Sequence, residues 1–155
     1  MSQILPSRQR PRLLIDAFKA GRISLADAPE LIHFAWTYDD SPTSDVGEPA
    51  WLELFEHAGF FTYPPVQVSR PASPVTLYRG TTTGRVRRMS WALERDVAAN
   101  AGRRHTGYGT TSMYKATVQP ETLLAYLHRP DEGWTVVVNP AGLTQIERLE
   151  ALPSP

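Results

Sequence analysis

Cysteine is absent from this chain of 155 residues, which excludes disulfides, thiolate metal ligands and a cysteine nucleophile. The histidines His33, His57, His105 and His128 show no spacing typical of a metal site, and we expect no metal. There is no excess charge either, because 16 basic residues balance 16 acidic ones. A strongly basic surface for binding duplex nucleic acid is therefore not indicated.

Long apolar runs are also missing, since none approaches the roughly 20 residues needed to span a bilayer. Residues 1–8 lack the apolar core of a signal peptide. We therefore expect a cytoplasmic protein that does not contact a membrane. The length suits a single domain, and a hydrophobic content of 41% supports a packed core.

Composition divides the expected single domain, residues 1–155, into two parts and a connector. Residues 1–61 show apolar periodicity typical of helices, and residues 75–152 are rich in strand-forming runs. Residues 62–74 carry several prolines, which disfavour both helix and central strand, and we interpret them as a proline-rich connector. The expected fold class is α+β, with about three helices ahead of a mainly antiparallel sheet.

The expected elements follow from periodicity and from glycines at helix ends. The first part should form helices over 12–21, after Ser24, and over 49–59. In the second of these helices the apolar face is Leu25, Leu31, Ile32, Phe34, Ala35 and Trp36. The second part should form strands over 75–78, 89–91, 112–118, 124–128, 134–138 and 146–152, with a helix over 93–103.

Three chemically capable residues stand at the edges of expected strands, in the order arginine, serine, glutamate. Arg79 ends one strand beside Gly80, Ser90 lies in the next, and Glu132 precedes the apolar run 135–138. Arginine offers a planar donor fork that suits phosphate, and glycine lets a ligand approach the backbone closely. A carboxylate can stabilise the oxocarbenium-like state formed when a glycosidic bond breaks.

In order and spacing these features resemble the ADP-ribosyltransferase superfamily of the arginine–serine–glutamate type, most of all its short bacterial and phage-borne members. The resemblance covers residues 74–150, about half of the chain. It implies a split, mainly antiparallel sheet behind N-terminal helices, and NAD as substrate without a metal. The matching segments are Tyr78-Arg79-Gly80, Ser90-Trp91 before an alanine-rich helix, Tyr114–Pro120, Leu124–Tyr126, and Glu132 before Val136–Pro140.

The resemblance also implies roles for the residues. Arg79 would hold the pyrophosphate or the adjacent ribose, with Gly80 allowing close approach of the dinucleotide. Ser90 would bind the ribose or orient Glu132. Glu132, with Asp131 beside it, would stabilise the charge that develops as the nicotinamide–ribose bond breaks. Aromatic contacts to the cofactor are expected from Tyr78, Trp91, Tyr108 and Tyr114.

The chain departs from the family pattern in three places. Pro130 stands where arginine-modifying members carry a glutamate or glutamine. Thr135 occupies the place directly before the apolar strand, where many members carry glutamate, and Ala92 replaces a second serine or threonine after Ser90. The resemblance therefore does not point to arginine as the acceptor.

Three functions remain open at this point. The first is an enzyme that moves ADP-ribose from NAD to an unknown macromolecular acceptor, protein or nucleic acid, or that hydrolyses NAD. The second is an inactive module on the same fold that binds a nucleotide or a protein. The third is an interaction protein of a phage or mobile element, in which the helical part makes the contact. A fold resemblance alone does not choose among them, because function resides in the site.

Overall fold

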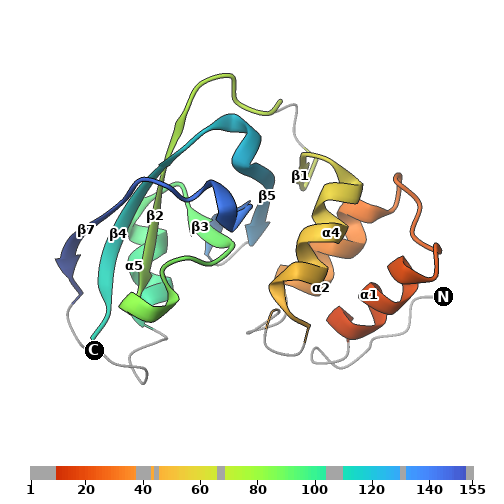
Figure 1. Ribbon diagram of the computed structural model, residues 1–155, viewed down its shortest axis with the longest axis horizontal. Helices are drawn as coiled ribbons and strands as arrows, with labels where there is room; N and C mark the ends of the chain where they lie inside the picture. The colour runs from red at the N-terminus through yellow and green to blue at the C-terminus, as the bar shows by residue number, and fades with distance from the viewer. Residues whose placement is uncertain are drawn as a thin grey trace.

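The computed structural model describes residues 10–37, 43, 46–65, 69–103, 110–129 and 132–152, and it has an α+β fold (Figure 1). The helices are α1 (Arg10–Lys19), α2 (Ala28–Thr37), α4 (Glu48–Ala58) and α5 (Arg95–Arg103). The strands are β1 (Phe61–Tyr63), β2 (Val75–Thr81), β3 (Ser90–Ala92), β4 (Ser112–Val118), β5 (Leu123–Arg129), β6 (Gly133–Val138) and β7 (Ile146–Ala151). Short 3-10 turns are η2 (Thr83–Arg85), η4 (Pro120–Thr122) and η5 (Pro140–Gly142). Within these ranges no helix is long and apolar enough to cross a membrane.

One seven-stranded sheet runs through the molecule in the order β1-β5-β6-β3-β2-β4-β7. Strand β1 pairs with β5 in parallel, and the other recorded pairings are antiparallel, which confirms the expected mainly antiparallel sheet. Strands β2 and β4 pair along the whole of β2, whereas β2 and β3 are joined at a single pair, Tyr78 opposite Ala92. The sheet is therefore weakly joined at its middle, between the halves β1-β5-β6-β3 and β2-β4-β7.

Apolar side chains cover both faces of the sheet, because successive residues of a strand point to opposite sides. Helices α1, α2 and α4 pack on the first half through a core that includes Ile32, Trp51 and Phe55, and Val137 of β6 belongs to it. Val136 and Val138, on either side of Val137, lie in a second core. Strand β6 is therefore buried on both faces over its three valines.

The proline-rich connector is shorter than expected, since Phe61–Tyr63 form strand β1 and pair with Ala125–Leu127. Thr62 is buried and Phe61 packs against the helical core, so burial and pairing outweigh the neighbouring prolines. Residues 62 and 63, which we expected in the connector, thus belong to the sheet.

Helix α2 turns only part of its expected apolar face inward. Ile32, Ala35 and Trp36 are buried, whereas Leu31 and Phe34 are 40% and 44% exposed. Leu25 lies before the helix and is 62% exposed. A helix packed on one side buries residues spaced three and four apart, and Leu31 and Phe34 fall beside that stripe.

Candidate functional site

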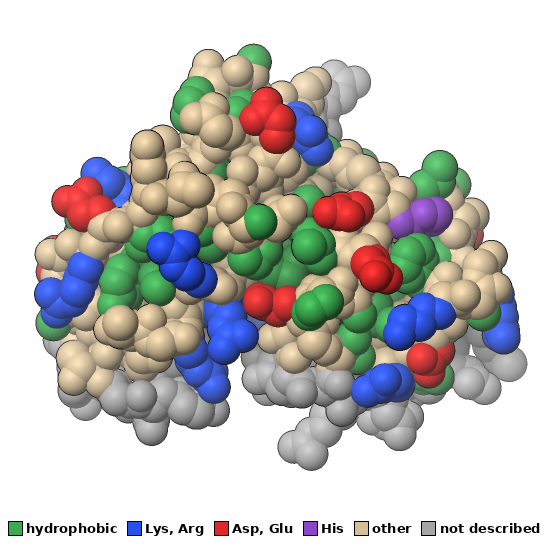
Figure 2. Space-filling view, in the orientation of Figure 1, with side chains coloured by type: hydrophobic (Ala, Val, Ile, Leu, Met, Phe, Trp, Pro, Cys, Tyr) green, Lys and Arg blue, Asp and Glu red, His purple; other side chains and the backbone are tan. Residues whose placement is uncertain are grey.

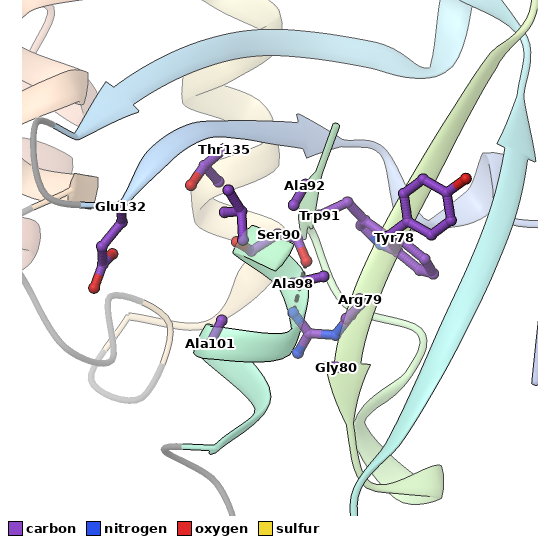
Figure 3. Close-up of a pocket in the computed structure, with 11 residues that line it drawn as sticks. Tyr78, Arg79, Gly80, Ser90, Trp91, Ala92, Ala98, Ala101, Glu132 and Thr135 are labelled. Atoms are coloured by element: carbon purple, nitrogen blue, oxygen red, sulfur yellow. Dashed lines mark hydrogen bonds between the residues drawn. The ribbon is translucent and has the colours of Figure 1, made fainter. Parts of the chain in front are cut away.

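A pocket lies beside the weak joint between β2 and β3, and α5 forms one of its walls (Figure 3). The cavity volume is about 60 Å³, and the whole hollow, open solvent included, measures about 390 Å³. Arg79, Ser90 and Glu132, which lie far apart in the sequence, all line this pocket. The lining residues are Tyr78, Arg79, Gly80, Ser90, Trp91, Ala92, Val97, Ala98, Ala101, Glu132 and Thr135.

The Arg79 side chain connects strand β2 to the segment that leads into β3, where the two strands share a single backbone pair. Its Nη1 donates to the carbonyl oxygen of Ser90 at 2.6 Å, and its Nε donates to the carbonyl oxygen of Arg85 at 3.1 Å. The guanidinium thus holds both ends of the segment from Arg85 to Ser90 against β2. Within the described part of the chain, no acceptor is recorded for the second N–H of Nη1 or for the two N–H groups of Nη2, and these donors remain for a ligand.

The charge of Arg79 is set by burial and by three charged neighbours. Burial lowers its pKa to about 10, and the positive charges of Arg88 and Arg85 lower it as well, whereas the Glu48 carboxylate raises it. Arg79 therefore stays positively charged at neutral pH. A buried cation with an unused donor beside a cavity is suited to bind an anion.

Ser90 and Trp91 contribute to the pocket in different ways. Ser90 is half-buried, and no protein partner in the described residues is recorded for its hydroxyl group. The Trp91 side chain is 2% exposed, packs in the core with Leu77, and donates from its ring nitrogen to the Arg88 carbonyl oxygen at 2.9 Å. Its ring is thus committed to the core, although the residue lines the pocket.

Of the other expected aromatic contacts, only one of those described lies at the pocket. Tyr78 lines it, and the Arg95 guanidinium lies 5.8 Å from the centre of its ring. Tyr114 is 5% exposed, packs in the core, and its hydroxyl lies 3.1 Å from that of Thr83. Tyr114 is not among the pocket residues, because its strand turns it into the core. Tyr108 lies outside the described residues.

Glu132 reaches the pocket from the turn before β6 and lies, in Figure 3, at the opposite end of the labelled set from Tyr78. Its backbone N–H donates to the Arg129 carbonyl oxygen at 3.0 Å. Its carboxylate lies 3.3 Å from Nη1 of Arg129, and both side chains are about 30% exposed. Asp131 lies outside the described residues.

Gly80 lines the pocket, but a helix occupies the space beside it. A Cβ atom there would meet the carbonyl oxygen of Ala98 at 2.5 Å and Cα of Gly102 at 3.1 Å. The absence of a side chain therefore lets α5 lie directly on β2. Glycine is needed at position 80 for this packing, in addition to any role in the approach of a ligand.

Sequence reasoning assigned no role to several lining residues. Thr135 faces the pocket from β6, opposite Ala92 of β3. Val97 and Ala101 form the wall from α5. The sequence signal for that wall was the alanine-rich helix that follows Ser90-Trp91. For Thr135 the signal was its place before the apolar strand.

In the described part of the chain no group of His, Asp and Glu could hold a metal ion. Comparison of the sequence with protein-family models and with curated proteins, and of the structure with solved structures, gave no match. The chemistry of the pocket must therefore be argued from its own residues.

Proposed function

We propose that the protein binds NAD at this pocket and is an ADP-ribosyltransferase of the arginine–serine–glutamate type, or an NAD glycohydrolase. The observation that supports the proposal is the convergence of Arg79, Ser90 and Glu132 on one pocket from three separate segments. An anchoring cation, a hydroxyl group and a carboxylate are the groups needed to hold a dinucleotide and cleave its glycosidic bond. The weakly joined, mainly antiparallel sheet is consistent with the split sheet of that family.

In this proposal each residue has one task. Arg79 directs Nη2 at the pyrophosphate or the adjacent ribose, and Ser90 offers its hydroxyl to the ribose. Glu132 stabilises the positive charge that develops on the ribose as nicotinamide leaves. A cavity of about 60 Å³ is too small for a whole dinucleotide, so only one part of NAD would enter it and the rest would lie in the open part of the hollow. The acceptor is water or a protein or nucleic acid.

A second candidate is a module on the same fold that binds the nucleotide without cleaving it. Two observations favour it. Thr135 offers a hydroxyl where many family members have a carboxylate, and it faces the pocket. Glu132 forms an ion pair with Arg129, 3.3 Å away, and this pair neutralises part of the negative charge of the carboxylate.

Release of nicotinamide from NAD, with and without cell extract, tests the first proposal. Glu132→Gln should lower the rate by about 10²–10³ while leaving NAD binding nearly intact, because the carboxylate acts on charge present only in the transition state. Arg79→Ala should instead weaken binding. Glu121→Gln, on an exposed residue, is the matched control. Full activity of Glu132→Gln would remove Glu132 from the mechanism, and binding without nicotinamide release would favour the second candidate.

A further inference from the structure

A carboxylate from the helical part of the chain reaches the strand that carries Ser90. Glu48 stands in the first turn of α4, and its Oε2 accepts the backbone N–H of Met89 at 3.0 Å. Its Oε1 lies 3.9 Å from Nη1 of Arg88, and the Glu48 side chain is only 20% exposed. Glu48 is thus a largely buried anion that contacts the backbone one residue before Ser90.

This contact completes a set of bonds that fixes the start of β3. The Met89 carbonyl accepts the N–H of Val138 at 2.8 Å, so Met89 is held from both sides. The next carbonyl, of Ser90, accepts the Arg79 guanidinium. Because Met89 and Ser90 are adjacent, moving the Met89 amide moves the carbonyl on which Arg79 depends.

Glu48 also acts on Arg79 through its charge. Arg79, Arg85 and Arg88 carry like charges, and Glu48 is the carboxylate whose charge favours the protonated form of Arg79 against their effect. Charge interactions are strong where water is largely excluded, so a buried counter-charge orients and holds the guanidinium.

We propose that Glu48 is a positioning residue of the pocket, which fixes Ser90 through the Met89 amide and holds the Arg79 guanidinium in its bridging position. The helical part then contributes to the site itself and is more than a scaffold beside it. The inference rests on the proposed function for the identity of the ligand, but not for the arrangement of Arg79 and Ser90.

Hydrogen exchange of the Arg79 Nε–H tests this without any ligand. The signal is identified in ¹⁵N spectra of the full chain by its loss in Arg79→Lys. Glu48→Ala should speed its exchange roughly tenfold or more, because displacement of the Ser90 carbonyl releases Nη1 and leaves the guanidinium held at the Arg85 carbonyl by Nε alone. Glu48→Gln keeps an acceptor for Met89 and should restore slow exchange in large part. Glu53→Ala, on the exposed side of the same helix, should leave exchange unchanged.

A titration with NAD forms the second arm. Glu48→Ala should weaken binding about as much as it speeds the exchange, and Glu53→Ala should not weaken it. Unchanged exchange in Glu48→Ala would overturn the proposal, and so would equal effects of Glu48→Ala and Glu53→Ala. If the wild-type protein binds no NAD, the proposed function fails, and the exchange experiment alone decides the role of Glu48.

Discussion

His33 should make the protein less stable in mildly acidic solution. Its side chain, on α2, is only 4% exposed, and its ring lies 4.4 Å from the ring of Tyr63. Its Nδ1 lies 3.3 Å from the hydroxyl oxygen of Thr37. Burial, and secondarily the positive charge of His128, lower the pKa of His33 to about 4. The folded protein therefore resists protonation of this ring, whereas the unfolded chain does not.

The sign and size of the effect follow from linkage between protonation and folding. The ordinary histidine pKa is 6.5, so between pH 6.5 and about 4 the unfolded chain binds more protons than the folded one. The contribution of neutral His33 is fully present above pH 6.5 and is lost progressively as the pH falls. At 1.36 kcal/mol for each unit, the full loss is about 3 kcal/mol, of which about 2.5 kcal/mol is gone by pH 4.5.

Urea unfolding at pH 7.5 and pH 4.5 measures the loss, and His33→Gln provides the comparison because glutamine does not titrate. The free energy of unfolding should fall with acid by about 2.5 kcal/mol more in the wild type than in His33→Gln. His128→Gln should reduce this difference slightly, since it removes the secondary cause. Equal pH dependence in wild type and His33→Gln, or an NMR titration of His33 near pH 6.5 in the folded protein, would refute the reasoning.

Three other outcomes are expected. Thr135→Glu adds a carboxylate inside the pocket and should raise nicotinamide release at least about tenfold over a weakly active wild type, whereas the exposed Thr76→Glu should not. Gly80→Ala places a Cβ 2.5 Å from a backbone carbonyl of α5 and should lower the free energy of unfolding by about 1–3 kcal/mol, against little change for Gly84→Ala, which meets no atom within 4 Å. Arg129→Gln removes the ion pair that neutralises part of the Glu132 charge, so it should raise kcat several-fold, and it should change the stability by less than about 1 kcal/mol, since the pair is partly exposed.

The sequence predicts the strands well where burial is strong and periodic. Strand β4 spans Ser112–Val118 as expected, and β6 differs from expectation by one residue. Strand β1 escaped prediction because it has three residues and pairs with a strand about 64 positions further along the chain. Its hydrogen bonds come from that distant partner, and no local pattern carries this information.

The site was predictable as a set of residues but not as an arrangement. Arg79, Ser90 and Glu132 could be found because each was expected at the end or border of a strand, although β2 continues to Thr81 and Arg79 therefore lies within it. Tyr114 lies directly opposite Arg79, so the two side chains leave the sheet on the same face. Tyr114 is buried in the core there and does not line the pocket, and the sequence gives no sign of how far along that face the pocket extends. Glu48 was missed because a helix contact with a distant backbone amide leaves no sequence signal.

Arg79 shows why a structural role and a ligand-binding role need not exclude each other. Burying a guanidinium costs free energy unless its donors find acceptors, and two carbonyls, of Arg85 and Ser90, provide them. A bridge made by Nε and Nη1 leaves the donors of Nη2 for a ligand, and Arg79 lines the pocket. The same two bonds that join the halves of the sheet also fix the direction of Nη2, so the bridge orients the anchor before any ligand arrives. Because the Arg79 side chain is already ordered, it loses no conformational entropy when the ligand binds. Substitution of Arg79 by lysine should therefore cost both stability and binding, because one ammonium cannot bridge two carbonyls and keep a directed donor for the ligand.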